Sequence, residues 1–166
     1  MFDRFGEFNS VEELNMAAEG QKKEGDEVSF YALAKENGID KEDAADYWNG
    51  DTDKLATASM AAFGRLDILE KEEIETKKNQ VEKMPLKVIL TMLKGMCADE
   101  EMAKAVMLKG KRLAKILEAM KEEARKYKTG GMAMACGTDR QLCEIIKAYY
   151  MDTDECFKEK ISSIYG

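Results

Sequence analysis

Apolar residues recur every three or four positions along most of the chain, and alternating, strand-like runs are essentially missing. The clearest stripe lies in residues 99–128, where apolar side chains return at helical spacing from Met102 to Ala124. A single proline, Pro85, and short polar stretches between the periodic segments argue against a sheet, because sheet proteins need many turns. The pattern therefore predicts an all-α protein.

Capping residues divide the first 52 residues into three short helices, which form a small N-terminal lobe. Each predicted helix lies between a start signal and a residue that ends a helix: Ser10 (with Glu13 completing a capping box) to Gly25, Glu27 to Gly38, and Asp40 to Gly50.

The remaining pattern predicts a long connecting helix and a C-terminal helical bundle. Residues 53–84 are expected to form one long charged helix, and Pro85 to begin a new helix at its favoured first position. Within the bundle, residues 85–166, the longest helix is expected over 99–128. Residues 129–137 follow as a simple connection, a hinge or a loop that a partner orders.

Charge is divided unevenly between the two halves of the chain. Residues 1–84 carry 11 Lys and Arg against 21 Asp and Glu, a net of −10, whereas residues 85–166 carry 15 against 12, a net of +3. Proteins that bind nucleic acid directly usually present a basic face, because neutralising phosphates supplies much of the affinity. The N-terminal half has the wrong sign for that role.

Residues 30–48 have the spacing of a helix-turn-helix, but the second helix is acidic. It presents four carboxylates with which phosphate would clash: Asp40, Glu42, Asp43 and Asp46. Three interpretations stay open: a DNA reader, a plain helical hairpin, or an acidic surface that occupies a site built for nucleic acid by pairing with its Arg and Lys. Trp48 is either a core residue or an anchor in such an interface.

The longest predicted helix is the basic exception, with nine Lys and Arg between residues 104 and 128. Its densest part consists of Lys109, Lys111, Arg112 and Lys115. These side chains form either the solvated face of a core helix or a contact for RNA, DNA or an acidic partner.

Histidine is absent from the sequence, which removes the commonest general base near neutral pH and the commonest metal ligand. Phosphate-binding loops, dinucleotide fingerprints and nucleophile elbows are also missing. The sequence therefore predicts a protein that is not an enzyme and that uses no cofactor or metal.

Four cysteines, at residues 97, 136, 143 and 156, lack the two-residue spacing of zinc or redox motifs and are expected to be free thiols. The sequence shows no basic, apolar leader and no run of roughly 18 apolar residues that would cross a membrane. We therefore expect a cytoplasmic protein without a membrane partner.

The segment from Phe30 to Gly50 and the stretch GTDRQLCEIIKAYYMD, residues 137–152, resemble small proteins of conjugative and phage-derived elements of gut Firmicutes. Some members of that group are anti-CRISPR inhibitors of type II CRISPR nucleases. The resemblance implies a mobile-element protein that binds the RNA-guided nuclease or its guide-RNA complex and blocks target-DNA binding or cleavage. The alternative is a DNA-binding regulator or conjugation accessory protein that acts as a homodimer through its long helix.

Overall fold

The computed structural model describes residues 2–127 and 137–165, and every regular element within these ranges is helical. The elements are α1 (Val11–Glu24), α2 (Glu27–Glu36), α3 (Lys41–Asn49), α4 (Ala58–Leu69), the π-helix η1 (Glu70–Glu75), α5 (Gln80–Met96), α6 (Glu100–Val106), α7 (Leu113–Lys126), α8 (Asp139–Met151) and α9 (Asp154–Ser162). The predicted all-α class is confirmed. Most of the predicted connection over residues 129–137 lies outside the described residues.

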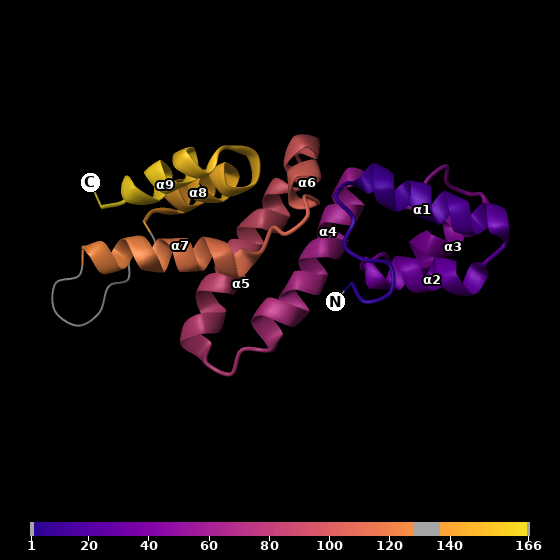
Figure 1. The fold of residues 1–166 in the computed structure, drawn as a ribbon, viewed down its shortest axis with the longest axis horizontal. Coiled ribbons are helices and arrows are strands. Elements are labelled where there is room, and N and C mark those ends of the chain that lie inside the picture. The colour runs from indigo at the N-terminus through magenta and orange to yellow at the C-terminus, as the bar shows by residue number, and fades with distance from the viewer. Residues whose placement is uncertain (1, 128–136, 166) are drawn as a thin grey trace.

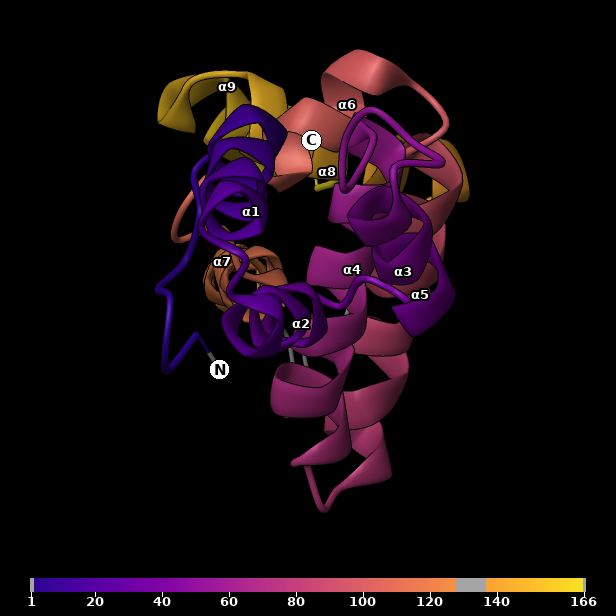
Figure 2. The same cartoon turned by 90° about the vertical axis from the view of Figure 1, so that its right-hand side faces the viewer.

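The molecule is elongated, with α1–α3 at one end, α7–α9 at the other and α4–α6 between them (Figure 1). The turn between η1 and α5 projects to one side of the long axis of the molecule and lies at the bottom of both views (Figure 1 and Figure 2). No helix in the described ranges is both long and apolar enough to cross a membrane.

Local capping chemistry sets the ends of α1 and α3 as the sequence predicts, except that Glu13 accepts from the Asn9 amide at 2.8 Å and does not complete the predicted capping box with Ser10. The Ser10 hydroxyl accepts a hydrogen bond from the Glu13 amide, and Gly25 ends α1 in the left-handed region, at φ +69°. The Asp40 carboxylate caps α3, which Gly50 closes at φ +91°. The three helices enclose an apolar core with Phe30 at its centre.

Helix α4 joins this lobe to the rest of the protein, because its two sides belong to different hydrophobic cores. Ala61 packs into the core of the lobe, whereas Ala62, Leu66 and Leu69 pack into the core formed with α5–α9. Where α4 crosses the turn between α2 and α3, a Cβ built on Gly64 would lie 2.3 Å from the Asn37 carbonyl oxygen. Only glycine permits this approach of the two backbones.

The prediction of one continuous helix over residues 53–84 is wrong. The Asn15 side chain hydrogen-bonds both the amide and the carbonyl of Ala56, at 3.0 and 2.9 Å, and so takes over backbone groups that a helix would need. Thr57 then caps α4. A second break precedes α5, which begins after the cap Asn79, so that Pro85 lies inside α5 rather than at its start.

The predicted helix over residues 99–128 is also interrupted, because residues 107–112 leave the helical path. Gly110 is left-handed, at φ +77°, and its amide donates to the Glu7 carboxylate instead of continuing a helix. The helix resumes at Leu113, whose amide donates to the carboxylate of Glu73 at 2.9 Å. Glu73, carried on η1, thus caps α7, whose own cap residue Arg112 offers no side-chain acceptor.

The C-terminal helices pack on α5 and α6 around residues such as Leu93, Ile116 and Ile145, which are fully buried. Thr138 begins α8 with a capping box, in which Gln141 accepts from the Thr138 amide. The Thr153 hydroxyl caps α9 by accepting a hydrogen bond from the Cys156 amide. Local side-chain caps therefore start both of the last two helices.

Candidate interaction surfaces

The four predicted carboxylates of the N-terminal lobe form one exposed patch, here called the acidic surface: Asp40, Glu42, Asp43 and Asp46. Asp40 caps α3 by accepting from the Glu42 amide at 2.8 Å. In the part of the chain that the structure describes, none of the four forms an ion pair. These carboxylates, Asp40 at the cap of α3 and three on the helix, thus face the solvent without an ion pair, and Lys41 is the only basic residue of α3.

The position of Asp46 is unfavourable for the helix that carries it. Glu42 and Asp46 stand four residues apart on the exposed side of α3, where like charges repel by about 0.2–0.5 kcal/mol. Asp46 also lies in the last turn, which contains no basic residue, so the helix dipole opposes its charge. The stability of α3 therefore gives no reason for a carboxylate at this position.

Trp48, predicted as a core residue or an interface anchor, is half-buried at the edge of the lobe core. Its indole packs on Phe30, with ring centroids 5.0 Å apart, and on Tyr31, at 6.4 Å. The exposed aromatic ring next to the acidic surface is instead Phe63, which is 41% exposed on α4.

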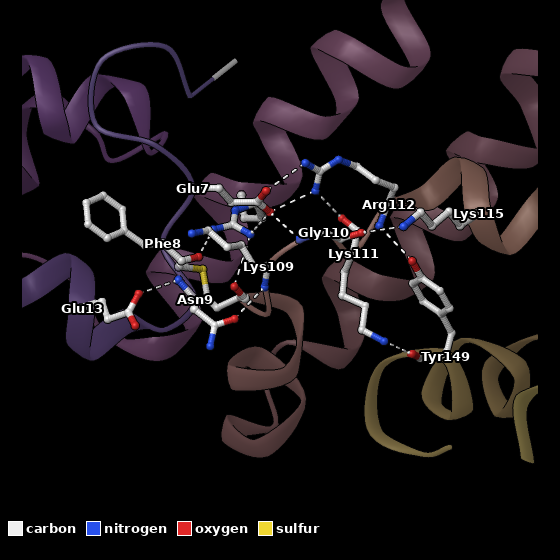
Figure 3. Close-up of polar contacts among 12 residues, drawn as sticks. Glu7, Phe8, Asn9, Glu13, Lys109, Gly110, Lys111, Arg112, Lys115 and Tyr149 are labelled. Atoms are coloured by element: carbon white, nitrogen blue, oxygen red, sulfur yellow. Dashed lines mark hydrogen bonds and ion pairs between the residues drawn. The ribbon is translucent and has the colours of Figure 1, made fainter. Parts of the chain in front are cut away.

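The four predicted basic residues do not form a helical face. Lys109, Lys111 and Arg112 lie in the break between α6 and α7, and only Lys115 lies on a helix. The Lys111 ammonium donates to the Tyr149 carbonyl oxygen at 2.6 Å and lies over the Tyr149 ring (Figure 3). Burial lowers the pKa of Lys111. The Lys111 ammonium is therefore bound by groups of the protein itself.

Arg112 is held in the same way, by a carboxylate from the N-terminal segment (Figure 3). Its guanidinium makes two parallel hydrogen bonds to Glu7, at 3.0 and 2.9 Å. Lys115 donates to the Gly110 carbonyl oxygen at 3.2 Å while remaining exposed, and the Lys109 side chain is exposed. The structure thus leaves only Lys109 and Lys115 of the four open to a partner.

No protein family, curated protein or solved structure with which the chain was compared matches it.

Glu7 also holds the most deeply buried charge in the described chain, Arg65. The Arg65 side chain is 2% exposed and donates to Glu7 at 2.8 Å and to the carbonyl oxygens of Phe8 and Met107. Burial alone would raise the pKa of Glu7, but the hydrogen bonds from Arg112 and Gly110 and the charge of Arg65 outweigh it, so the pKa is lowered. This Glu7 network, comprising Glu7, Arg65, Arg112 and the Gly110 amide, fastens the N-terminal segment across the junction of the two cores.

Features of an active site are weak in the described residues. They contain no cluster of three or more Cys, Asp or Glu side chains that would hold a metal ion. Burial raises the pKa of the Cys97 thiol to about 11, which suppresses the reactive thiolate. A cleft of about 960 Å³ between α1, α3 and α6 is lined by both lysines and carboxylates and so favours no ligand of one charge.

Sequence reasoning missed Phe63, Arg65 and Glu7. Phe63 gave one usable signal, because it is a large apolar residue that lies off the stripe formed by Ala62, Leu66 and Leu69. Arg65 and Glu7 are 58 positions apart, and nothing in the local pattern pairs them.

Proposed function

We propose that this protein is an inhibitor that docks its acidic surface on the positively charged nucleic-acid channel of a type II CRISPR nuclease and blocks target-DNA binding or cleavage. The observation that carries the proposal is the set of four exposed carboxylates, Asp40 at the cap of α3 and three on the helix, that form no ion pair among the described residues. Such nucleases hold guide RNA and target DNA in channels lined by basic side chains. Carboxylates fixed at regular spacing can pair with those side chains in place of phosphates.

The placement of Asp46 supports a role in binding, because the residue opposes the stability of its own helix. If the charge at position 46 served only to keep α3 soluble, lysine would serve equally well and would also stabilise the last turn of the helix. Residues of a binding site often reduce the stability of the helix or strand that carries them.

The alternative, a DNA-binding regulator, gains little from the arrangement of the basic residues. It requires a basic helix that could also form a dimer, whereas α6 and α7 are separate helices and Arg112 is bound to Glu7. Two exposed lysines, Lys109 and Lys115, supply few of the phosphate contacts that direct DNA binding needs.

The test is target-DNA binding and cleavage by a reconstituted type II nuclease loaded with guide RNA. The wild-type protein should inhibit and co-elute with the nuclease, and the triple reversal Glu42→Lys, Asp43→Lys, Asp46→Lys should abolish both. A control with the same change in charge, Glu118→Lys, Glu122→Lys, Glu155→Lys, alters exposed carboxylates outside α3 and should inhibit normally. Raising the salt concentration should weaken the wild-type complex.

Full nuclease activity with the wild-type protein across several nuclease orthologues would refute the proposal. If that result were joined by salt-sensitive binding to bare duplex DNA in a gel shift, the DNA-binding regulator would replace it.

A further inference from the structure

A hollow of about 360 Å³ lies beside the acidic surface, where α4 meets the turn between α2 and α3. The close approach of the Gly38 and Gly64 backbones brings the start of α3 directly against α4. Because of this approach, Asp40 and Asp43 of α3 border the same hollow as Phe63 of α4. The hollow is therefore built jointly by two elements that tertiary packing fixes in place.

The walls of the hollow combine apolar surface with negative charge. Its apolar part comes from Ile39, Met60 and Phe63, and its carboxylates are Asp40, Asp43 and Asp67. None of the described residues that line it is Lys or Arg. Asp67 binds Lys94 at 2.8 Å from outside the hollow, yet its side chain remains 52% exposed.

Phe63 is the distinctive member of this wall. Leu66 and Leu69, which follow it on α4, are fully buried and Ile68 is half-buried, whereas Phe63 is 41% exposed. An aromatic ring that is open to solvent and bordered by carboxylates attracts a cation over its face, since the ring quadrupole and the carboxylates act with the same sign. A purely apolar ligand would strip water from Asp40 and Asp43 without pairing them, and these carboxylates would repel a phosphate.

We infer that this hollow receives an arginine side chain of the partner protein, with the guanidinium stacked on Phe63 and hydrogen-bonded to Asp43 and Asp67. Arginine fits better than lysine, because its flat guanidinium stacks on an aromatic ring while its N–H groups reach carboxylates in a fork. The inference rests on the proposed function, and it names Phe63 as the aromatic anchor of the acidic surface and arginine as the group that it receives.

The first arm of the test needs no nuclease. A short capped peptide with two arginines, and its lysine counterpart, are titrated into the full chain carrying isotope-labelled phenylalanine, and the ring signals are followed by NMR. The Phe63 signal, assigned from the Phe63→Leu variant, should shift in a saturable way with the arginine peptide and several-fold less with the lysine peptide. The Asp43→Asn, Asp67→Asn double variant should lose the response. A Phe63 signal that does not move, or that responds equally to both peptides, would overturn the inference.

The second arm measures binding of the protein to the guide-loaded nuclease. Phe63→Ala should weaken the complex by at least about tenfold, and Phe63→Leu by about threefold to tenfold, because leucine keeps apolar bulk but not the ring. Met84→Ala, which truncates a residue 65% exposed on α5, is the matched control and should bind like the wild type.

The two arms distinguish failure of the inferred arginine site from failure of the proposed function. If reversal of the acidic surface abolishes nuclease binding while Phe63→Ala binds normally, the arginine hollow is wrong and the proposed function stands. If the arginine peptide shifts Phe63 but no nuclease binds, the hollow stands and the nuclease is the wrong partner.

Discussion

Replacing Glu7 with glutamine should destabilise the protein, because it removes the only carboxylate that pairs with the buried Arg65 in the described structure. Breaking a buried ion pair by removing one partner costs about 3–5 kcal/mol. Two features reduce that figure. Arg65 keeps the carbonyl oxygens of Phe8 and Met107 as acceptors, and the Glu7 side chain is itself 12% exposed. We therefore expect a loss of about 2–3 kcal/mol at pH 7.

Urea unfolding measures this loss by far-ultraviolet circular dichroism and by the fluorescence of Trp48, the single tryptophan of the chain, which reports on the N-terminal lobe. A loss of this size moves the midpoint by about 1 M urea or more. Glu24→Gln, which alters an exposed carboxylate, is the control and should leave the midpoint unchanged.

The effect should depend on pH in a defined direction. The folded state lowers the pKa of Glu7, so the stability that its charge contributes is present above the ordinary value of 4.5 and is lost as the pH falls through the lowered folded value. The difference between wild type and Glu7→Gln should therefore narrow in acid. A variant as stable as the Glu24→Gln control, or a difference that does not change with pH, would refute the role assigned to the Glu7 network.

Three further predictions concern backbone packing, capping and thiol reactivity. Gly64→Ala should lower the free energy of unfolding in urea by about 2–3 kcal/mol, because its Cβ would press on a backbone carbonyl. Gly95→Ala, with open space around it, should be neutral or stabilising, and equal effects of the two changes would contradict the close packing at Gly64. Glu73→Gln should lower stability by about 0.5–1 kcal/mol by weakening the cap of α7, and an unchanged thermal midpoint would argue against that cap. Because burial raises the pKa of Cys97 to about 11, its thiol should resist alkylation at pH 8 in the native protein and react in urea. Peptide mass spectrometry would measure this labelling, and rapid labelling of the native protein would contradict the burial.

The features that the sequence predicted correctly are those that depend on local chemistry. Ser10 and Asp40 cap helices because their side chains reach amides two or three residues away, and Gly25 and Gly50 end helices because their backbones tolerate positive φ. The exposed acidic residues of α3 followed from the same local pattern. Helix class, most helix ends and the acidic surface were therefore accessible without tertiary information.

The two failed helix predictions have tertiary causes. The apolar stripe over residues 99–128 is real, but Glu7 takes the amide of Gly110 from about a hundred positions away and Glu73 supplies the cap that restarts the helix. Asn15 similarly holds Ala56 out of a helix. The basic cluster lost its predicted face for the same reason, because carboxylates and carbonyls distant in sequence bind Lys111 and Arg112.

The most direct test of the acidic surface is the single variant Asp46→Lys, examined for stability and for nuclease inhibition side by side. Lysine at this position relieves the repulsion from Glu42 and suits the last turn of α3, so the free energy of unfolding should stay equal or rise by about 0.5–1 kcal/mol. Inhibition of target-DNA binding or cleavage should nevertheless weaken by about tenfold or more. A variant that is at least as stable as the wild type and inhibits the nuclease equally well would contradict the claim that the acidic surface binds the partner.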